Sequence, residues 1–173
     1  MENIILIGMP ASGKSTVGVL LAKAVGYGFI DSDLVIQSRE GRLLSRIIED
    51  EGLEAFLRIE EKINAELCAD RCVIATGGSV VYGEKAMEHF KEMGKIVYLK
   101  LSYEELAGRL SDLKGRGVAI KEGFTLKDLY DERVPLYEKY ADVTVDLDGT
   151  DIAGALRRAG EASTAKSIAS CEP

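Results

Sequence analysis

The sequence is poor in the residues that build metal centres, disulfide networks and histidine-based active sites. Its 173 residues include three cysteines and one histidine, His89. Cys68 and Cys72 lie four positions apart, and no neighbouring cysteine or histidine completes a ligand set around them. We therefore expect structural thiols in a reducing compartment, not a zinc site or a disulfide framework. A catalytic triad built on histidine has only one candidate residue.

Long apolar runs and an excess of positive charge are also missing. No stretch approaches the roughly 18 apolar residues of a membrane-spanning helix, so we expect none. The first residues include Glu2 and no basic cluster, and their apolar run is too short for a signal peptide. A net charge of −7 disfavours nucleic acid or an anionic membrane surface as the main partner. These features predict a cytoplasmic protein that acts on a small molecule, and we expect a monomer.

Strand-like and helix-like segments alternate along the chain. Short apolar runs predict strands over residues 3–8, 28–31, 72–76, 95–101 and 143–147. Helical patterns cover residues 14–25, 33–39, 43–51, 53–69, 85–93, 103–111, 126–140 and 151–159. This alternation predicts a parallel sheet with helices on both faces. The length predicts one domain over residues 1–160, followed by a small, polar tail over 161–173 that we expect to fray.

Residues Gly8–Ser15 have the sequence G-M-P-A-S-G-K-S, which matches the phosphate-loop (P-loop) pattern G-x-x-x-x-G-K-[ST]. A predicted strand precedes it and a predicted helix follows it, which is the context that the pattern requires. Its glycines let backbone N–H groups approach phosphate oxygens, and the helix adds the positive end of its dipole. We assign ATP binding to Gly8, Ala11, Ser12, Gly13, Lys14, Ser15 and Thr16. The pattern alone is compatible with a kinase, another NTPase or a nucleotide-dependent binding module.

Within this loop, Lys14 supplies a positive charge for the β and γ phosphates, and Ser15 offers a hydroxyl to Mg²⁺. Enzymes with such a loop also carry a carboxylate at the end of a second strand. The run at 72–76 is followed by Gly77, Gly78 and Ser79, none of which is acidic, whereas the run at 28–31 ends in Asp31-Ser32-Asp33. Two carboxylates that lie two apart on an extended segment project to the same side. One can hold the metal and the other can orient or deprotonate a substrate hydroxyl; a helix cap at Asp31 or Ser32 is the compatible alternative.

The segment from Asp112 to Gly123, D-L-K-G-R-G-V-A-I-K-E-G, contains three glycines and three cations between two predicted helices. A solvated surface loop is one interpretation. The other is a mobile lid over about 112–123 whose arginine closes over the nucleotide phosphates. The phosphate loop favours the lid.

Together these features resemble the shikimate kinase family, which belongs to the nucleoside-monophosphate-kinase-like group of phosphate-loop proteins. The resemblance extends from Asn3 to about Ala159. It rests on the order and spacing of Gly8–Ser15, Phe29–Asp33, Phe56–Glu60, Thr76–Gly78, Arg116, Arg133–Tyr137 and Ala141–Asp142. It implies a three-layer α/β/α P-loop NTPase fold with a five-stranded parallel sheet and a mobile lid.

The resemblance also implies roles for individual residues. Lys14, Asp33 and Arg116 would be catalytic, with Asp33 binding the acceptor hydroxyls and acting as the base. Ser15 and Asp31 would hold Mg²⁺, the aspartate through water, and Arg109 would stack near the adenine. Gly77 and Gly78 would line the acceptor site, and Arg133 would pair with the substrate carboxylate, a bidentate contact that suits a guanidinium.

Three positions differ from the family pattern. The pattern Phe-Arg-x-x-Glu has Leu57 where its arginine stands, although Arg58 follows and is kept as a candidate acceptor-site cation. Ser79 replaces a third glycine, and Gly117 replaces the proline after the lid arginine. We expect an ATP- and Mg²⁺-dependent kinase that phosphorylates shikimate. The alternatives are another hydroxylated acceptor such as homoserine, or a non-catalytic nucleotide-binding regulator.

Overall fold

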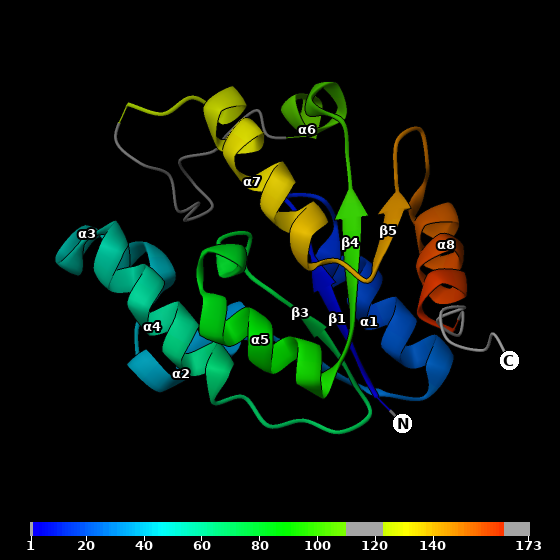
Figure 1. The fold of residues 1–173 in the computed structure, drawn as a ribbon, viewed down its shortest axis with the longest axis horizontal. Helices are drawn as coiled ribbons and strands as arrows, with labels where there is room; N and C mark the ends of the chain where they lie inside the picture. The colour runs from blue at the N-terminus through cyan, green and yellow to red at the C-terminus, as the bar shows by residue number, and fades with distance from the viewer. Residues whose placement is uncertain (1, 110–122, 165–173) are drawn as a thin grey trace, which may run out of the picture.

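The computed structural model describes residues 2–109 and 123–164 (Figure 1). Five strands in these ranges form one sheet in the order β2-β3-β1-β4-β5, and all neighbours are parallel. The strands are β1 (Asn3–Ile7), β2 (Gly28–Asp31), β3 (Cys72–Ala75), β4 (Gly94–Lys100) and β5 (Val143–Asp146). The predicted five-stranded parallel sheet is confirmed, and every strand boundary agrees to within one residue.

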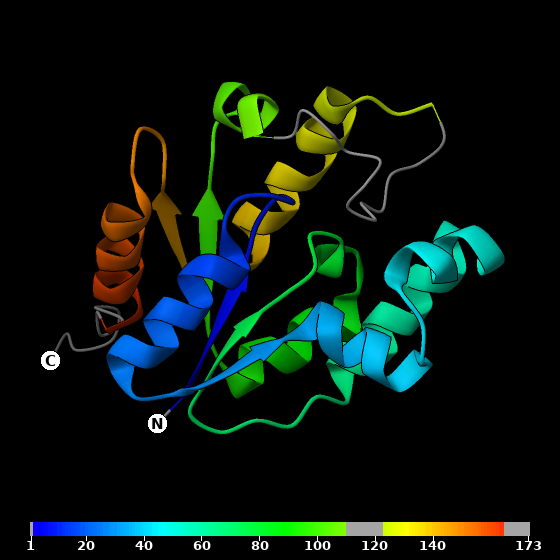
Figure 2. The same ribbon diagram turned by 180° about the vertical axis from the view of Figure 1, so that it is seen from behind.

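Helices cover both faces of this sheet. One face carries α1 (Lys14–Val25) and α8 (Ile152–Thr164), and the other carries α5 (Glu84–Met93) and α7 (Leu126–Tyr140), as Figures 1 and 2 show. The remaining helical elements are α2 (Ser32–Glu40), α3 (Leu44–Glu51), α4 (Leu53–Ala65), the 3₁₀ helix η1 (Val80–Tyr82) and α6 (Tyr103–Arg109). The architecture is the predicted three-layer α/β/α arrangement. Among the residues described, no helix has both the length and the apolar character needed to cross a bilayer.

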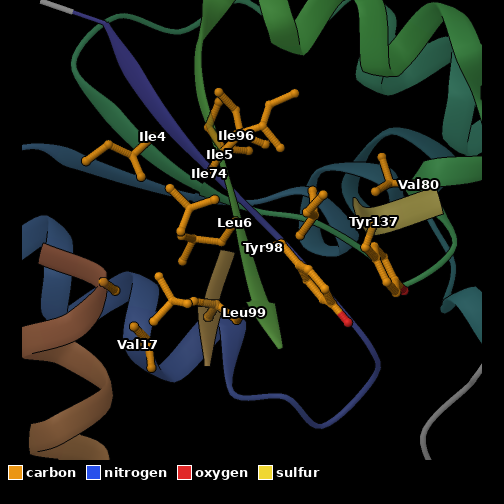
Figure 3. Packing of buried hydrophobic residues seen from close by; sticks show 14 of the residues in the cluster. Ile4, Ile5, Leu6, Val17, Ile74, Val80, Ile96, Tyr98, Leu99 and Tyr137 are labelled. Atoms are coloured by element: carbon orange, nitrogen blue, oxygen red, sulfur yellow. The ribbon is translucent and has the colours of Figure 1, made fainter. Parts of the chain in front are cut away.

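The central strand β1 is buried along its whole length because it has neighbours on both sides and helices on both faces. Ile5 pairs with Ile74 of β3 on one side and with Ile96 of β4 on the other (Figure 3). A continuous apolar run is what such a strand requires. Each large aliphatic side chain buried here stabilises the fold by about 1.5–3 kcal/mol. This packing holds the ends of the strands in place, and with them the loops that follow.

Helix α7 is fastened to the sheet by an aromatic pair. The rings of Tyr137 and Tyr98 stack with centroids 5.1 Å apart, and both side chains are fully buried (Figure 3). Tyr137 also donates a 2.5 Å hydrogen bond to the carbonyl of Gly78 in the loop after β3. This contact fixes the position of α7, which carries Arg133 one turn earlier.

Helices α2, α3 and α4 form a group beyond β2 and have an apolar cluster of their own (Figure 1). Ile36, Ile47, Phe56 and Ile63 are its buried members. Leu57 packs against this cluster. The side chain that replaces the family's arginine therefore contributes to packing.

Among the described residues, two helix ends lie four or more residues from the sequence-based boundaries. Helix α4 ends at Ala65, not at residue 69, because Leu67 leaves the helix to join the main core, where its carbonyl accepts a 2.7 Å hydrogen bond from His89 Nε2. Helix α8 continues to Thr164, so the tail does not begin at residue 161. Lys95 of β4 donates a 2.9 Å hydrogen bond to the carbonyl of Ala162, which holds the last turn of the helix against the sheet.

Candidate active site

A cavity of about 290 Å³ opens at the carboxyl ends of β1, β2 and β3. Its walls come from the loops after β1 and β3 and from α1, α2, α3, α4 and α7. The lining residues are Pro10, Ala11, Gly13, Lys14, Ser15, Thr16, Asp33, Leu44, Phe56, Thr76, Gly77, Gly78, Ser79 and Arg133. Ligands of open α/β sheets bind at this edge of the sheet. The cavity thus brings together predicted residues that are more than a hundred positions apart in the sequence.

The loop between β1 and α1 has a backbone that favours glycine at two positions. Gly8 has φ 147° and Gly13 has φ 96°, and a Cβ atom at Gly8 would lie 2.7 Å from the carbonyl oxygen of Leu99. Ala11 also has a positive φ of 62°, which is unusual for a residue with a side chain. The buried hydroxyl of Ser12 has no hydrogen-bond partner among the described residues. A concave loop with an unpaired polar atom fits an anionic ligand such as a phosphate chain.

Lys14, the first residue of α1, is folded over this loop. Its side-chain nitrogen donates hydrogen bonds of 2.7 Å to the carbonyl of Gly8 and 2.8 Å to that of Met9. Burial lowers the pKa of Lys14 to about 8, although the carboxylates of Asp33 and Asp31 oppose the shift. The ammonium group is therefore held at the cavity wall, beside both carboxylates.

Ser15 and Asp31, the two residues predicted to hold Mg²⁺, are in contact with each other. The Ser15 hydroxyl donates a 2.7 Å hydrogen bond to Asp31 Oδ2, while Asp31 Oδ1 accepts from the backbone N–H groups of Asp33 and Leu34. Asp31 therefore caps α2 with one oxygen and faces the phosphate loop with the other. In the part of the chain that the structure describes, no group of three or more acidic, cysteine or histidine residues forms a metal cage. Mg²⁺ held by a hydroxyl, one carboxylate, phosphates and water fits these residues.

The two aspartates do not share an extended segment, as their spacing had suggested. Asp31 ends β2 and Asp33 lies in the first turn of α2, because the cap at Asp31 starts the helix at Ser32. Asp33 nevertheless lines the cavity. Burial and the negative charge of Asp31 together raise the pKa of Asp33 to about 6, although Lys14 opposes the shift. A carboxylate with a raised pKa next to a phosphate-binding loop suits proton transfer near neutral pH.

The loop after β3 brings its backbone close to these carboxylates. A Cβ atom at position 77 would come too close to Asp33 Oδ1 and Glu60 Oε1, so a side chain there would require these two carboxyl groups to shift. The N–H of Gly77 donates a 3.3 Å hydrogen bond to the buried hydroxyl of Ser32. A Cβ atom at Gly78 would lie 2.8 Å from Pro10 and 3.1 Å from a guanidinium nitrogen of Arg133. The two glycines therefore join the donor and acceptor sides of the cavity.

Arg133 is almost fully buried, with 1% of its surface exposed, although it also lines the cavity. Its Nε donates a 3.1 Å hydrogen bond to the hydroxyl of Tyr82, whose ring lies 5.1 Å from the guanidinium carbon. These contacts fix the orientation of the guanidinium plane. A buried, oriented arginine at a cavity wall can bind a carboxylate in a bidentate manner.

Two residues at this end of the cavity were not assigned a role from the sequence. Glu60 is 2% exposed, and Ser79 donates a hydrogen bond to its carboxylate when that group is ionised. Burial raises the pKa of Glu60 to about 7 despite the hydrogen bond from Ser79. Position 60 was part of the motif behind the resemblance, and its spacing of four from Phe56 placed both residues on one helix face. From this spacing, Glu60 could have been predicted to lie near the site.

A second cavity, of about 560 Å³, lies beside the phosphate loop between α1, α6 and α8. Its lining residues are Ser12, Gly13, Thr16, Val17, Arg109, Leu147, Thr150, Asp151, Ile152, Ala153 and Ala155. Arg109, predicted to lie near the adenine, is on this wall. The second cavity shares Gly13 and Thr16 with the first, so one extended ligand can reach both.

One predicted cation lies away from this assembly, and another is not among the described residues. Arg58 is exposed on α4 and does not line either cavity. The helix turns by about 100° per residue, so Phe56 faces the cavity while Arg58 points elsewhere. Arg116 and the lid over about 112–123 lie, except for Gly123, outside the described residues.

Comparison with known proteins supports this description of the chain. The family model described as shikimate kinase matches residues 10–167. A shikimate kinase of Thiobacillus denitrificans is 39% identical over 160 residues, which cover 90% of this chain and 87% of the relative. A shikimate kinase of Pseudomonas fluorescens is 40% identical over 151 residues, which cover 86% of this chain and 88% of the relative. The structure of shikimate kinase from Acinetobacter baumannii in complex with shikimate is similar with a TM-score of 0.80 and 33% identity, covering 93% of this chain and 90% of that one.

Proposed function

The chain belongs to the shikimate kinase family and is a phosphotransferase with an alcohol group as acceptor; from this we propose that it transfers the γ-phosphoryl group of ATP to a hydroxyl of shikimate, with Mg²⁺. The observation that carries the proposal is the single cavity lined by Lys14, Asp33 and Arg133. These side chains supply a cation for phosphates, a base for a hydroxyl and a cation for a carboxylate. A small hydroxylated carboxylic acid uses all three.

On the donor side, the backbone of the phosphate loop and Lys14 bind the β and γ phosphates. Ser15 and Asp31 hold Mg²⁺, which neutralises charge on those phosphates when it is bound. The second cavity, beside Arg109, takes the nucleoside. The unpaired Ser12 hydroxyl and the Ser15–Asp31 contact support this arrangement.

On the acceptor side, Arg133 binds the carboxylate and Asp33 hydrogen-bonds the reacting hydroxyl. The hydroxyl oxygen forms a bond to the γ-phosphorus, the bond from that phosphorus to the bridging oxygen of ADP breaks, and the hydroxyl proton passes to Asp33. The backbone of the Gly77–Gly78 loop lines the floor of the acceptor site. In this proposal Arg116 stabilises charge on the transferred group.

Two departures from the family pattern, Leu57 and Ser79, favour a second candidate for the acceptor. Leu57 packs in the apolar cluster of α2–α4, and Ser79 adds a hydroxyl to the cavity wall. A pocket with one arginine binds a carboxylate less tightly than one with two, by about ten- to a hundredfold for a charge-assisted bond. Another hydroxylated metabolite such as homoserine is therefore the second candidate. We also propose that the protein is a monomer and acts in the cytoplasm.

An ATP-consumption assay tests the proposal directly. Shikimate, homoserine and a panel of hydroxy acids and polyols are compared at saturating ATP and Mg²⁺, and the product is identified by ³¹P NMR. We expect shikimate to give the highest kcat/KM. A higher kcat/KM with homoserine would move the assignment to the second candidate, and no turnover above ATP hydrolysis with any acceptor would refute both.

A further inference from the structure

Glu60 is a buried carboxyl beside Gly77, next to the acceptor end of the cavity, that the mechanism above does not use. It lies on α4 with 2% of its surface exposed, and its Oε1 has no hydrogen-bond partner among the described residues. Oε1 and Asp33 Oδ1 both approach the Cα of Gly77, so the two carboxyl groups share the space around one glycine. Two carboxylates this close and this buried disfavour each other's ionised form.

Among the described residues, two cations act on the carboxyl of Glu60. They are Arg133 of α7 and Lys14 of α1, and the anion that acts on it is Asp33 of α2. Two other titratable groups lie nearby. Burial, and to a smaller extent the charge of Glu60, raises the pKa of Tyr137 of α7. The hydroxyl of Tyr82 of η1 accepts a hydrogen bond from Arg133.

The remaining helices packed against α4 direct their polar groups elsewhere. On α3, Arg46 and Glu49 pair with each other at 2.8 Å. On α5, His89 bonds to the carbonyl of Leu67, and the backbone N–H of Lys85 donates to Glu61. The charge state of Glu60 is therefore governed by groups of the cavity itself.

Binding of an acceptor carboxylate changes this balance. Arg133 can neutralise one carboxylate, but with a ligand bound it would face two, that of the ligand and that of Glu60. The arginine that the family pattern has at position 57 is absent, since Leu57 packs into the apolar cluster. A proton on Glu60 removes the excess negative charge at the lowest cost, because its carboxyl is already held in a site that disfavours the ion.

We propose that binding of the acceptor carboxylate to Arg133 carries a proton onto Glu60, so that acceptor affinity falls as the pH rises through the range in which free Glu60 ionises. The inference rests on the proposed function. Burial raises the pKa of Glu60 to about 7. Acceptor affinity is therefore full below about pH 7 and declines above it, until the pH exceeds the still higher pKa of the complex.

Ser79 allows the site to hold both forms of Glu60. A hydroxyl donates a hydrogen bond to a carboxylate and accepts one from a carboxylic acid. Its bond to Glu60 favours the ionised form and lowers the pKa that burial raises. A glycine at this position would lose that bond and move the pH response upward.

The experiment measures shikimate affinity and proton uptake between pH 6.5 and 8.5, using the whole chain. For the wild type, the dissociation constant and the KM for shikimate rise about tenfold over this range. Isothermal titration at pH 8 in two buffers of different ionisation enthalpy shows uptake of about half a proton or more per shikimate bound.

Two variants identify the group. In Glu60→Gln the shikimate KM varies by less than about twofold over the same range, and the proton uptake disappears. Lys14 also titrates, near pH 8, and is still present in this variant. Any pH dependence of the shikimate KM that remains therefore belongs to Lys14. Ser79→Gly keeps the slope and shifts it to higher pH.

The outcomes separate this inference from the proposed function. No phosphorylation of shikimate at any pH refutes the function. Phosphorylation with no proton uptake by the wild type, or with the wild-type slope retained in Glu60→Gln, overturns the inference alone. The wild-type calorimetry needs no variant, so it decides the matter even if Glu60→Gln does not fold.

Discussion

The donor and acceptor ends of the cavity are built in different ways. The proposed donor end is a contiguous segment, Gly8–Thr16, that offers its backbone and a buried lysine for binding. The acceptor end is assembled from α2, α4, α7 and the loop after β3, with side chains that are far apart in the sequence. A loop that binds through its backbone tolerates few changes, whereas an assembled site can exchange one side chain at a time. The departures at Leu57 and Ser79 fall on the assembled end.

The largest effect is expected at the donor end, from Lys14→Ala. Loss of the ammonium removes charge stabilisation of the transferred phosphoryl group, and kcat/KM should fall by about a thousandfold or more. The measurement is the coupled kinase assay, with far-UV circular dichroism to show that the fold is kept. Lys23→Ala, an exposed lysine on the same helix, is the matched control and should leave activity within about twofold. Similar losses in both variants would contradict the assigned role of Lys14.

The acceptor end is tested by Arg133→Lys. A lysine keeps the charge but loses the bidentate geometry and the bond to Tyr82, so the shikimate KM should rise by about ten- to a hundredfold. The ATP KM should change little, because Arg133 belongs to the other end of the cavity. Arg157→Lys on the exposed side of α8 is the control. A rise in the ATP KM with an unchanged shikimate KM would reverse the assignment.

The pH profile tests Asp33, which lies between the two ends. Burial and Asp31 raise its pKa to about 6 in the folded protein. The ionised form is the base, so activity is present above this pKa and is lost as the pH falls below it. We expect kcat/KM for shikimate to decline about tenfold per pH unit below pH 6. An acid limb near pH 4, typical of an unperturbed aspartate, would disagree with the buried site.

The smallest effect is expected from restoring the family residue with Leu57→Arg. A second cation can strengthen carboxylate binding by one charge-assisted bond, but Leu57 also packs in the apolar cluster of α2–α4. These effects oppose each other, so we expect shikimate affinity to improve by about three- to tenfold, with some loss of thermal stability. Titration calorimetry and thermal unfolding measure the two parts. Leu57→Lys serves as the control for charge without a planar guanidinium.

The contrast between the two ends also explains how far the sequence could predict the molecule. The phosphate-loop sequence between strand and helix and the parallel sheet follow from local patterns, and the structure has this strand–loop–helix order and this sheet as expected. The hydrogen bond between Ser15 and Asp31 was not predicted. Arg133 was proposed by resemblance, but its burial and its contact with Tyr82 depend on α7 docking through Tyr137. The place of Glu60 beside Gly77 depends on how α4 packs against the loop after β3, which no local pattern specifies. Arg58 shows the opposite case. A cation was expected at the acceptor site, but the position of Arg58 on α4 directs it away from the cavity.

A crystal structure with shikimate and a non-hydrolysable ATP analogue tests the central claim most directly. The account predicts the shikimate carboxylate on the guanidinium of Arg133, a ring hydroxyl within hydrogen-bond distance of Asp33, and the triphosphate in the Gly8–Ser15 loop. Shikimate held by Arg58, or bound outside the cavity that Lys14, Asp33 and Arg133 share, would contradict it.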